Sequence, residues 1–110
     1  MTLRVFFVDY CEGKRVDSKD AWEATLEDIL HEMDCVLHYP RNFIGVIDGN
    51  DVTIQFMVNK DKTILVDVPV PEEGGSYGKT TDLRECLNLV RKIGDRIQLE
   101  EIDGLTFERW

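Results

Sequence analysis

Residues 42–70 read NFIGVIDGNDVTIQFMVNKDKTILVDVPV, and this stretch decides the fold. Three apolar runs are separated by two segments rich in turn-forming residues, 48–51 and 59–62. In the second and third runs every other residue is apolar, which indicates strands with one face in a core. Pro69 cannot donate a backbone hydrogen bond, so we expect the third strand to lie at an edge or to leave the sheet there. The stretch predicts an antiparallel meander of three strands.

The N-terminal side supplies a further strand and a helix. Residues 3–10, LRVFFVDY, are apolar at both parities, which predicts a central strand covered on both faces. Turn-forming residues follow at 12–14, and Asp17 or Ser18 suits the N-cap of a helix. Between that helix and the meander, residues 35–42 (CVLHYPRN) fit either a short strand or an extended connection. The helix would carry on its apolar face Trp22, Leu26, Ile29, Leu30 and Met33.

The C-terminal side supplies a second helix and a last strand. We expect a helix from Asp82 to Ile93, with Asp82 and Glu85 resembling a capping box and Gly94 ending the helix. The tail DRIQLEEIDGLTFERW alternates weakly, which predicts a short strand or an ordered extension. The order β-α-β-β-β-α-β predicts one α+β domain over residues 1–110, with two helices on one face of a mostly antiparallel sheet. The second helix would bury Leu83, Cys86, Leu87 and Val90.

Residues 74–80, GGSYGKT, follow an apolar run and precede a helical pattern, as a phosphate-binding loop does. That motif needs four residues between its first glycine and the Gly-Lys pair, and here Glu73 stands at the glycine position. Glu72 and Glu73 would also bring two carboxylates to the phosphate, and the preceding strand belongs to a meander. We therefore expect neither a nucleotide nor another small-molecule cofactor, but a glycine-rich loop with an exposed Tyr77.

Residues 31–38, HEMDCVLH, contain potential metal ligands, and we weighed them as a site. His31 and Cys35 are one helical turn apart, but Pro40 and the nearby β-branched residues predict that the helix does not continue to His38. Structural zinc sites have paired ligands at two ends of a loop, and this chain has one cluster. No nucleophile motif and no carboxylate in apolar surroundings is visible, so the sequence predicts neither a metal site nor an enzyme. A small hydrolase or metal enzyme using His31, Cys35 or His38 remains the open alternative.

The charge balance indicates a protein partner. The chain has 13 Lys and Arg against 22 Asp and Glu, a formal net charge of −9 at pH 7. Such a surface repels nucleic acids and anionic membranes and attracts basic proteins. Three cysteines without paired spacing suit a reducing compartment. The apolar N-terminal run is too short for a signal peptide or a membrane span, so we expect a cytoplasmic protein.

Acidic residues gather at the predicted turns and on solvent-facing strand positions, where they could share one side. Tyr77 and Trp110 are candidate anchors, since aromatic residues are common among interface hot spots. Carboxylates around aromatics would give fast, specific association with a basic protein; the alternative, for any single acid, is a solvated surface. A further acidic group lies in the tail, at Glu100, Glu101 and Asp103. The candidate partner-binding residues are Asp48, Asp51, Asp67, Glu72, Glu73, Tyr77 and Trp110.

Residues 18–110 resemble small immunity proteins of bacterial polymorphic toxin systems. The similarity is one of layout: SKDAWEATLEDILHE, the meander beginning NFIGVI, the glycine-bearing segment, DLRECLNLVRKIG and LTFERW. The resemblance implies a non-enzymatic acidic domain that neutralises a cognate toxin, often a nuclease or nucleic-acid deaminase, by covering its basic active-site cleft. It implies no catalytic residue, because such proteins inhibit by binding. An acidic adaptor or a secretion chaperone is the alternative.

Overall fold

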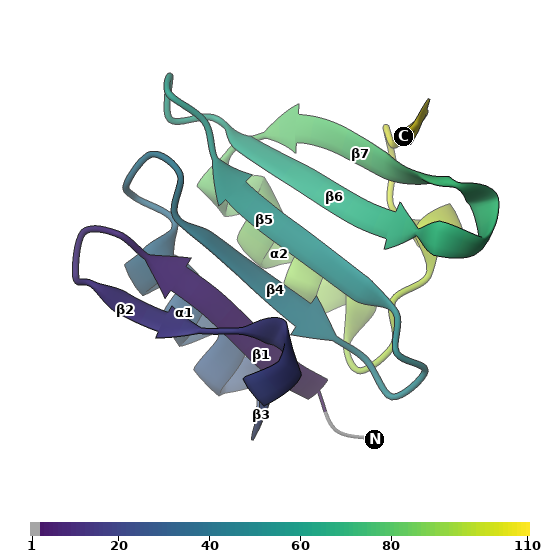
Figure 1. Ribbon diagram of the computed structural model, residues 1–110. Coiled ribbons are helices and arrows are strands. Elements are labelled where there is room, and N and C mark those ends of the chain that lie inside the picture. Colours follow the sequence, from purple (N-terminus) through teal and green to yellow (C-terminus); the bar gives the residue numbers. More distant parts are fainter. Residues whose placement is uncertain (1–2) are drawn as a thin grey trace.

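The structure is a computed structural model that describes residues 3–110 as one antiparallel sheet with two helices on one face (Figure 1). The strand order is β2-β1-β4-β5-β6-β7-β8, and the short strand β3 also pairs with β1. The predicted α+β class is confirmed. The elements are β1 Leu3–Asp9, β2 Lys14–Val16, η1 Ser18–Asp20, β3 Trp22–Ala24, α1 Leu26–Val36, β4 Phe43–Ile47, β5 Thr53–Val58, β6 Ile64–Val70, η2 Pro71–Glu73, β7 Gly75–Thr81, α2 Leu83–Ile93, η3 Leu99–Glu101 and β8 Thr106–Arg109.

The hydrophobic core lies between the sheet and the two helices. Period-two alternation places one set of side chains from β5 and β6 in this core, as the sequence predicts. Both faces of β1 are buried, also as predicted. Removal of this apolar surface from water, worth about 25 cal/mol per Å², is the main favourable term in folding. Fully buried core residues include Ile29, Met33, Ile54, Phe56, Val66, Cys86 and Val90.

Helix α1 begins later than predicted because a capping box fixes its start. The Thr25 hydroxyl accepts a hydrogen bond from the Asp28 N–H at 3.1 Å, and the Asp28 carboxylate accepts one from the Thr25 N–H at 3.3 Å. Residues 22–24 instead form β3, where Trp22 is 37% exposed. The predicted start at Asp17 or Ser18 is wrong. Trp22 lies four residues before Leu26, which is helical spacing, but it belongs to a strand.

Helix α2 begins as predicted, with Asp82 as its N-cap. The Asp82 carboxylate accepts the Glu85 N–H at 2.8 Å. The buried face is rotated from the predicted one: Leu89 and Ile93 are buried with Cys86, whereas the predicted core residues Leu83 and Leu87 are partly exposed. Burial raises the pKa of the Cys86 thiol to about 12, with the nearby Asp82 and Glu85 carboxylates adding to the shift.

Residues 75–81, predicted as a loop, form strand β7. The strand pairs with β6 from Gly75 to Thr81 and with β8 from Gly75 to Gly78. A Cβ at Gly75 would overlap the Phe107 ring and the β8 backbone, so this glycine permits close packing of strands. The loop prediction is wrong because it assigns all three glycines of this stretch to a turn. Only Gly74, with a φ of 71°, lies in a turn, whereas Gly75 and Gly78 belong to β7. Tyr77 is correspondingly half-buried.

Pro69 lies in a central strand, just beyond the residues of that strand that pair with β5. β6 pairs with β5 only from Ile64 to Asp67, whereas its pairing with β7 continues to Val70. The prediction of an edge strand is therefore wrong for β6 as a whole. The strand leaves β5 before Pro69, where the missing N–H would otherwise face a partner.

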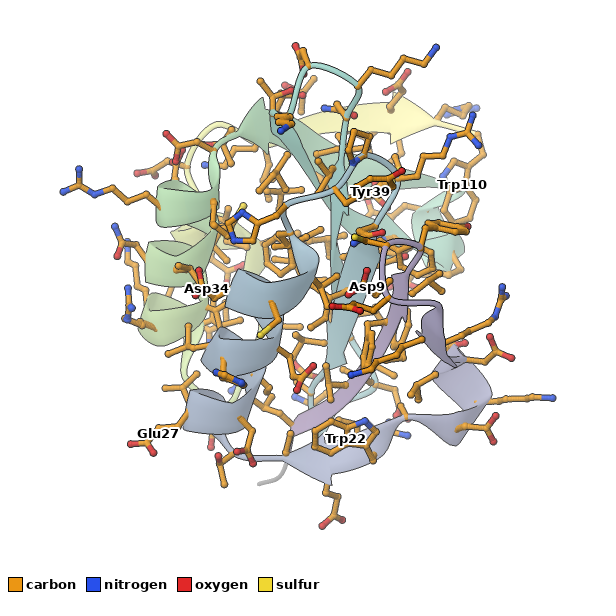
Figure 2. All side chains as sticks on the ribbon, turned by 90° about the vertical axis from the view of Figure 1, so that its left-hand side faces the viewer. Asp9, Trp22, Glu27, Asp34, Tyr39 and Trp110 are labelled. Atoms are coloured by element: carbon orange, nitrogen blue, oxygen red, sulfur yellow. The ribbon has the colours of Figure 1, made fainter. Side chains whose placement is uncertain are left out.

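Two buried polar residues organise the connection between α1 and β4. Asn42 donates from Nδ2 to Asp9 Oδ1 at 2.8 Å and to the Val36 carbonyl at 2.9 Å, and its Oδ1 accepts the Tyr10 N–H. Asp9, labelled in Figure 2, also accepts the backbone N–H groups of Cys11 and Glu12 in the turn after β1. Neither alternative left open for residues 35–42 is right: Cys35 and Val36 end α1, and residues 37–41 form turns, not a strand or an extended segment.

Candidate acidic interface

An acidic groove lies at the end of the sheet where β4 and β6 finish. The turn between β4 and β5 and the segment after β6 lie at this same end, toward the right in Figure 1. Together with residues 96–100 they enclose a hollow of about 400 Å³. Its lining contains the carboxylates of Asp51, Glu72, Glu73 and Glu100, and one guanidinium, that of Arg96. We call these four acids the acidic rim.

Glu72 and Glu73 lie in a short turn next to the residues predicted as aromatic anchors. They belong to η2, which ends at Gly74 in the left-handed conformation. The Tyr77 hydroxyl donates to Glu73 Oε1 at 3.0 Å, and this hydrogen bond raises the pKa of Tyr77. The Tyr77 ring contacts Phe107 of β8, with ring centroids 5.0 Å apart.

Trp110 follows β8 and lies beside the same turn. Its backbone N–H donates to the Gly74 carbonyl at 3.0 Å, and its side chain is 70% exposed. The structure thus brings Glu72, Glu73, Tyr77 and Trp110 together, as a mixed acidic and aromatic surface next to the groove. Exposed aromatic side chains offer large contact area at low entropy cost in an interface.

Asp51 is the third predicted acid on the groove. Its carboxylate is exposed and accepts a hydrogen bond from Arg4 Nη2 at 2.7 Å. Surface ion pairs of this kind contribute little to stability and exchange readily with water. Asp51 therefore adds less free negative charge to the rim than Glu72 or Glu73.

Asp48 lies on the same turn as Asp51 but is not a surface residue. It is 1% exposed. Its Oδ1 accepts the N–H groups of Asn50 and Val52, both at 2.9 Å, and its Oδ2 accepts the N–H of Ile97 at 2.9 Å. The prediction that Asp48 lies on the exposed acidic surface is wrong, because the carboxylate is used to fasten the turn to residue 97.

Asp67 is set apart from the acidic rim. It lies on β6 opposite Gln55 and Gly78, on the sheet face that carries no helix. Phe43, Met57 and Leu65 line a hollow with it on that face. The seven predicted residues therefore divide into five near the groove, one buried and one on the open face.

Sequence reasoning leaves Glu100 and Arg96 out of the candidate site. The sequence groups Glu100 with Glu101 and Asp103 in an acidic tail and gives no reason to place it beside Glu72. Residues 94–102 fold back because Ile97 and Ile102 are buried in the core, which brings Glu100 to the groove. The two isoleucines, five residues apart in a charged segment, are the signal that could have indicated this return.

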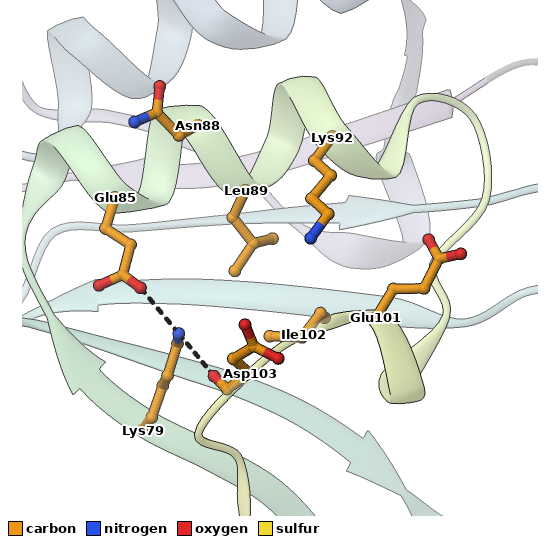
Figure 3. Close-up of a pocket in the computed structure, with 8 residues that line it drawn as sticks. All are labelled: Lys79, Glu85, Asn88, Leu89, Lys92, Glu101, Ile102 and Asp103. Atoms are coloured by element: carbon orange, nitrogen blue, oxygen red, sulfur yellow. Dashed lines mark hydrogen bonds and ion pairs between the residues drawn. The ribbon is translucent and has the colours of Figure 1, made fainter.

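Lys79, the lysine of the rejected phosphate motif, serves the packing of β7 against α2. Its Nζ donates to Glu85 Oε1 at 3.0 Å and to the Asp103 carbonyl at 2.7 Å (Figure 3). The side chain is only 15% exposed. The Thr81 hydroxyl donates to the other Glu85 oxygen, and both contacts lower the pKa of Glu85.

The potential metal ligands of α1 form two separate pairs. Cys35 Sγ lies 3.7 Å from His31 Nε2, and His38 Nε2 lies 3.7 Å from Asp34 Oδ1. Helix α1 ends at Val36, as Pro40 predicts, so His38 lies beyond the helix. Figure 2 shows Asp34 at the surface of the helix. Within residues 3–110 no three such ligands converge.

Comparison of the chain with protein-family models, with curated proteins and with solved structures finds no match. Neither helix in residues 3–110 has the length and apolar composition needed to cross a bilayer.

Proposed function

We propose that this protein is a non-enzymatic inhibitor that binds a basic protein domain through the acidic rim and its neighbouring aromatic residues. The observation that carries the proposal is the gathering of four carboxylates around one groove, in a chain of net charge −9. A cationic cleft would meet complementary charge there, while Trp110 provides an exposed apolar anchor.

The resemblance to immunity proteins suggests what the partner is. It would be the toxin domain of a polymorphic toxin system, with a nuclease or nucleic-acid deaminase activity and a cleft built to hold phosphate backbones. An acidic rim competes for such a cleft by the same electrostatics. Inhibition then needs occlusion alone, and this chain would work in the bacterial cytoplasm, where a toxin would act.

The test is protection of cells. The reading frame just upstream is expected to encode a large protein with an unrelated, basic C-terminal domain. Expressing that domain alone should arrest growth, and coexpression of this chain should restore it. A complex of the two purified proteins that leaves the toxin active would contradict the proposal.

The groove is tested by charge reversal. The double change Glu72→Lys and Glu73→Lys should weaken protection and binding while leaving the unfolding free energy within about 1 kcal/mol, because both side chains are exposed. The matched control is Glu27→Lys with Asp34→Lys on the exposed side of α1, far along the chain from the rim (Figure 2). If both double variants protect cells equally well, the interface does not lie at the groove.

A secretion chaperone or acidic adaptor is the second candidate, and one observation favours it. β8 forms an edge of the sheet, its four residues are exposed, and an extended client segment could add to it as a further strand. A chaperone would bind an unfolded segment of its client, whereas an inhibitor would bind the folded toxin domain. Binding to the partner before and after its denaturation separates the two.

A further inference from the structure

We infer that the open face of the sheet carries a receptor groove for an arginine side chain of the partner protein. The groove has a volume of about 230 Å³ and is lined by Phe43, Gln55, Met57, Leu65 and Asp67. It belongs to β4, β5 and β6, on the face opposite the helices. The inference rests on the proposed function for the source of the arginine, and it adds a contact surface distinct from the acidic rim.

The groove is apolar except for one carboxylate and one amide. Met57 is 39% exposed, an unusual position for a large apolar side chain in the middle of a sheet, and Leu65 stands opposite it in the next strand. Phe43 lies opposite Met57 on the other side. These three side chains form an apolar lining that would cover the methylene stem of a long side chain.

Asp67 is partly buried at the end of this apolar surface and has no cationic partner within residues 3–110. The side chain also makes no hydrogen bond there, and the facing residue on β7 is Gly78, which leaves the carboxylate accessible. Gln55, directly opposite on β5, supplies an amide oxygen as a second acceptor. A partly buried carboxylate without a partner gains most from a donor that arrives with its own charge.

The arginines next to the groove are already engaged. Arg4 pairs with Asp51 at 2.7 Å, and Arg15, which lines the adjoining hollow, pairs with Asp17 at 2.7 Å. Lys19 also lines the adjoining hollow and forms no ion pair with Asp67 within residues 3–110. The Asp67 carboxylate is therefore open to a positive group from an outside molecule.

Arginine fits this surface better than lysine or an apolar side chain. Its planar, weakly hydrated guanidinium can stack on the Phe43 ring while donating to Asp67 and to the Gln55 oxygen. A lysine ammonium is compact and strongly hydrated, and it would lose water against Met57 and Leu65 without the second planar contact. An apolar side chain would bury the Asp67 carboxylate without a partner, which is unfavourable.

The experiment uses the full chain and a short probe, the blocked tripeptide Gly-Arg-Gly, observed by NMR at the Met57 methyl group and the Gln55 side-chain amide. We expect saturable shifts at both groups. The matched tripeptides with lysine and with the neutral analogue citrulline should bind more weakly, by ~10-fold for citrulline, which lacks the charge. Citrulline binding equal to that of arginine would overturn the inference.

Variants of the chain test whether the arginine binds in this groove. Asp67→Asn should weaken arginine binding by ~10-fold with an otherwise unchanged spectrum, whereas Asp103→Asn, an exposed aspartate outside the groove, should leave it unchanged. Met57→Ala, a change at a partly exposed residue, should also weaken arginine binding, observed in this variant at the Gln55 side-chain amide. Retained binding in Asp67→Asn, or loss in Asp103→Asn, would refute the assignment. Because the probe is a peptide, this outcome is independent of whether Glu72 and Glu73 protect cells from a toxin.

Discussion

At the scale of single residues, burial decides what an acidic side chain does. Asp48 and Asp51 share a turn and are three residues apart, yet one carboxylate is enclosed by three backbone N–H donors and the other is exposed. Local sequence does not separate them, because the third donor belongs to Ile97, which is 49 residues further along. Asp48 is therefore a structural residue, and the exposed rim contains the residues that can meet a partner.

We expect Asp48→Asn to lower the free energy of unfolding by about 2 kcal/mol, because an amide nitrogen would replace one acceptor facing buried N–H groups. The matched change Asp51→Asn should cost less than about 1 kcal/mol, since it removes only an exposed ion pair. Asparagine also tolerates the left-handed backbone of residue 51. Urea denaturation measures both variants. Equal losses of unfolding free energy in the two variants would contradict the role of the Asp48 carboxylate in holding the turn to residue 97.

At the scale of elements, the strands with regular alternation could be predicted and the others could not. Buried and more exposed residues alternate along the whole of β5 and β6, so the sequence predicts which side chains of these strands face the core. β2 and β3 have three residues each, too few for a period to show. β7 contains two glycines whose role depends on neighbouring strands, and this role becomes visible only in three dimensions. The candidate site follows the same division: the η2 acids were predictable, and Glu100 was not.

The contact between β1 and β4 depends on a glycine. The Phe6 ring lies across Gly45 and packs edge-on against Phe43, with ring centroids 6.5 Å apart. A methyl group at residue 45 would overlap the ring, so Gly45→Ala should lower the unfolding free energy by about 1–3 kcal/mol. Phe6→Leu in the same chain should recover part of that loss. A double-mutant cycle by urea denaturation tests this, and additive costs would argue against direct overlap.

The junction of β7 and α2 predicts a pH effect. The Thr81 hydroxyl and the Lys79 ammonium lower the pKa of Glu85 below its ordinary value of 4.5. Because the folded-state pKa is depressed, the stabilisation is present above pH 4.5 and is lost as the pH falls through the lower folded-state value. The stability difference between the natural chain and Glu85→Gln should therefore be largest near neutral pH and shrink in acid. Thermal unfolding across pH 2–7 measures it. The control is Glu101→Gln, because Glu101 lines the same small pocket as Lys79 and Glu85 but its carboxylate makes no hydrogen bond within residues 3–110. A stability difference between the natural chain and Glu85→Gln that stays constant into acid would contradict the assignment.

At the scale of the whole molecule, charge is unevenly distributed. Four acids and one arginine line the groove at one end, while Tyr10, Tyr39, Arg41 and Lys60 surround a hollow next to the opposite turns. The chain would approach a basic partner with its acidic end first, because the field of the whole molecule acts before any contact forms. The net charge could be predicted from the composition, but the distribution of the charged residues over the surface could be seen only in the structure.

We expect the rate of association with the proposed basic partner to fall steeply as salt rises, since ions screen exposed charges over roughly 8 Å at physiological ionic strength. The dissociation rate should change much less, because it depends on contacts already formed. Stopped-flow or surface-based kinetics at several salt concentrations measures both rates. An association rate indifferent to salt would remove electrostatic steering from the proposal.

The strand order has a consequence for how the chain is made. From β4 to β8 each strand neighbours the one before it, so on the ribosome every new strand meets an edge that is already present. β1 is different: β2 and β3 pair with one of its edges soon after it is made, whereas its neighbour on the other edge, β4, is translated only after α1. During that interval the nascent N-terminal segment, buried on both faces in the folded protein, keeps one edge unpaired and is the part that would most need protection by a chaperone.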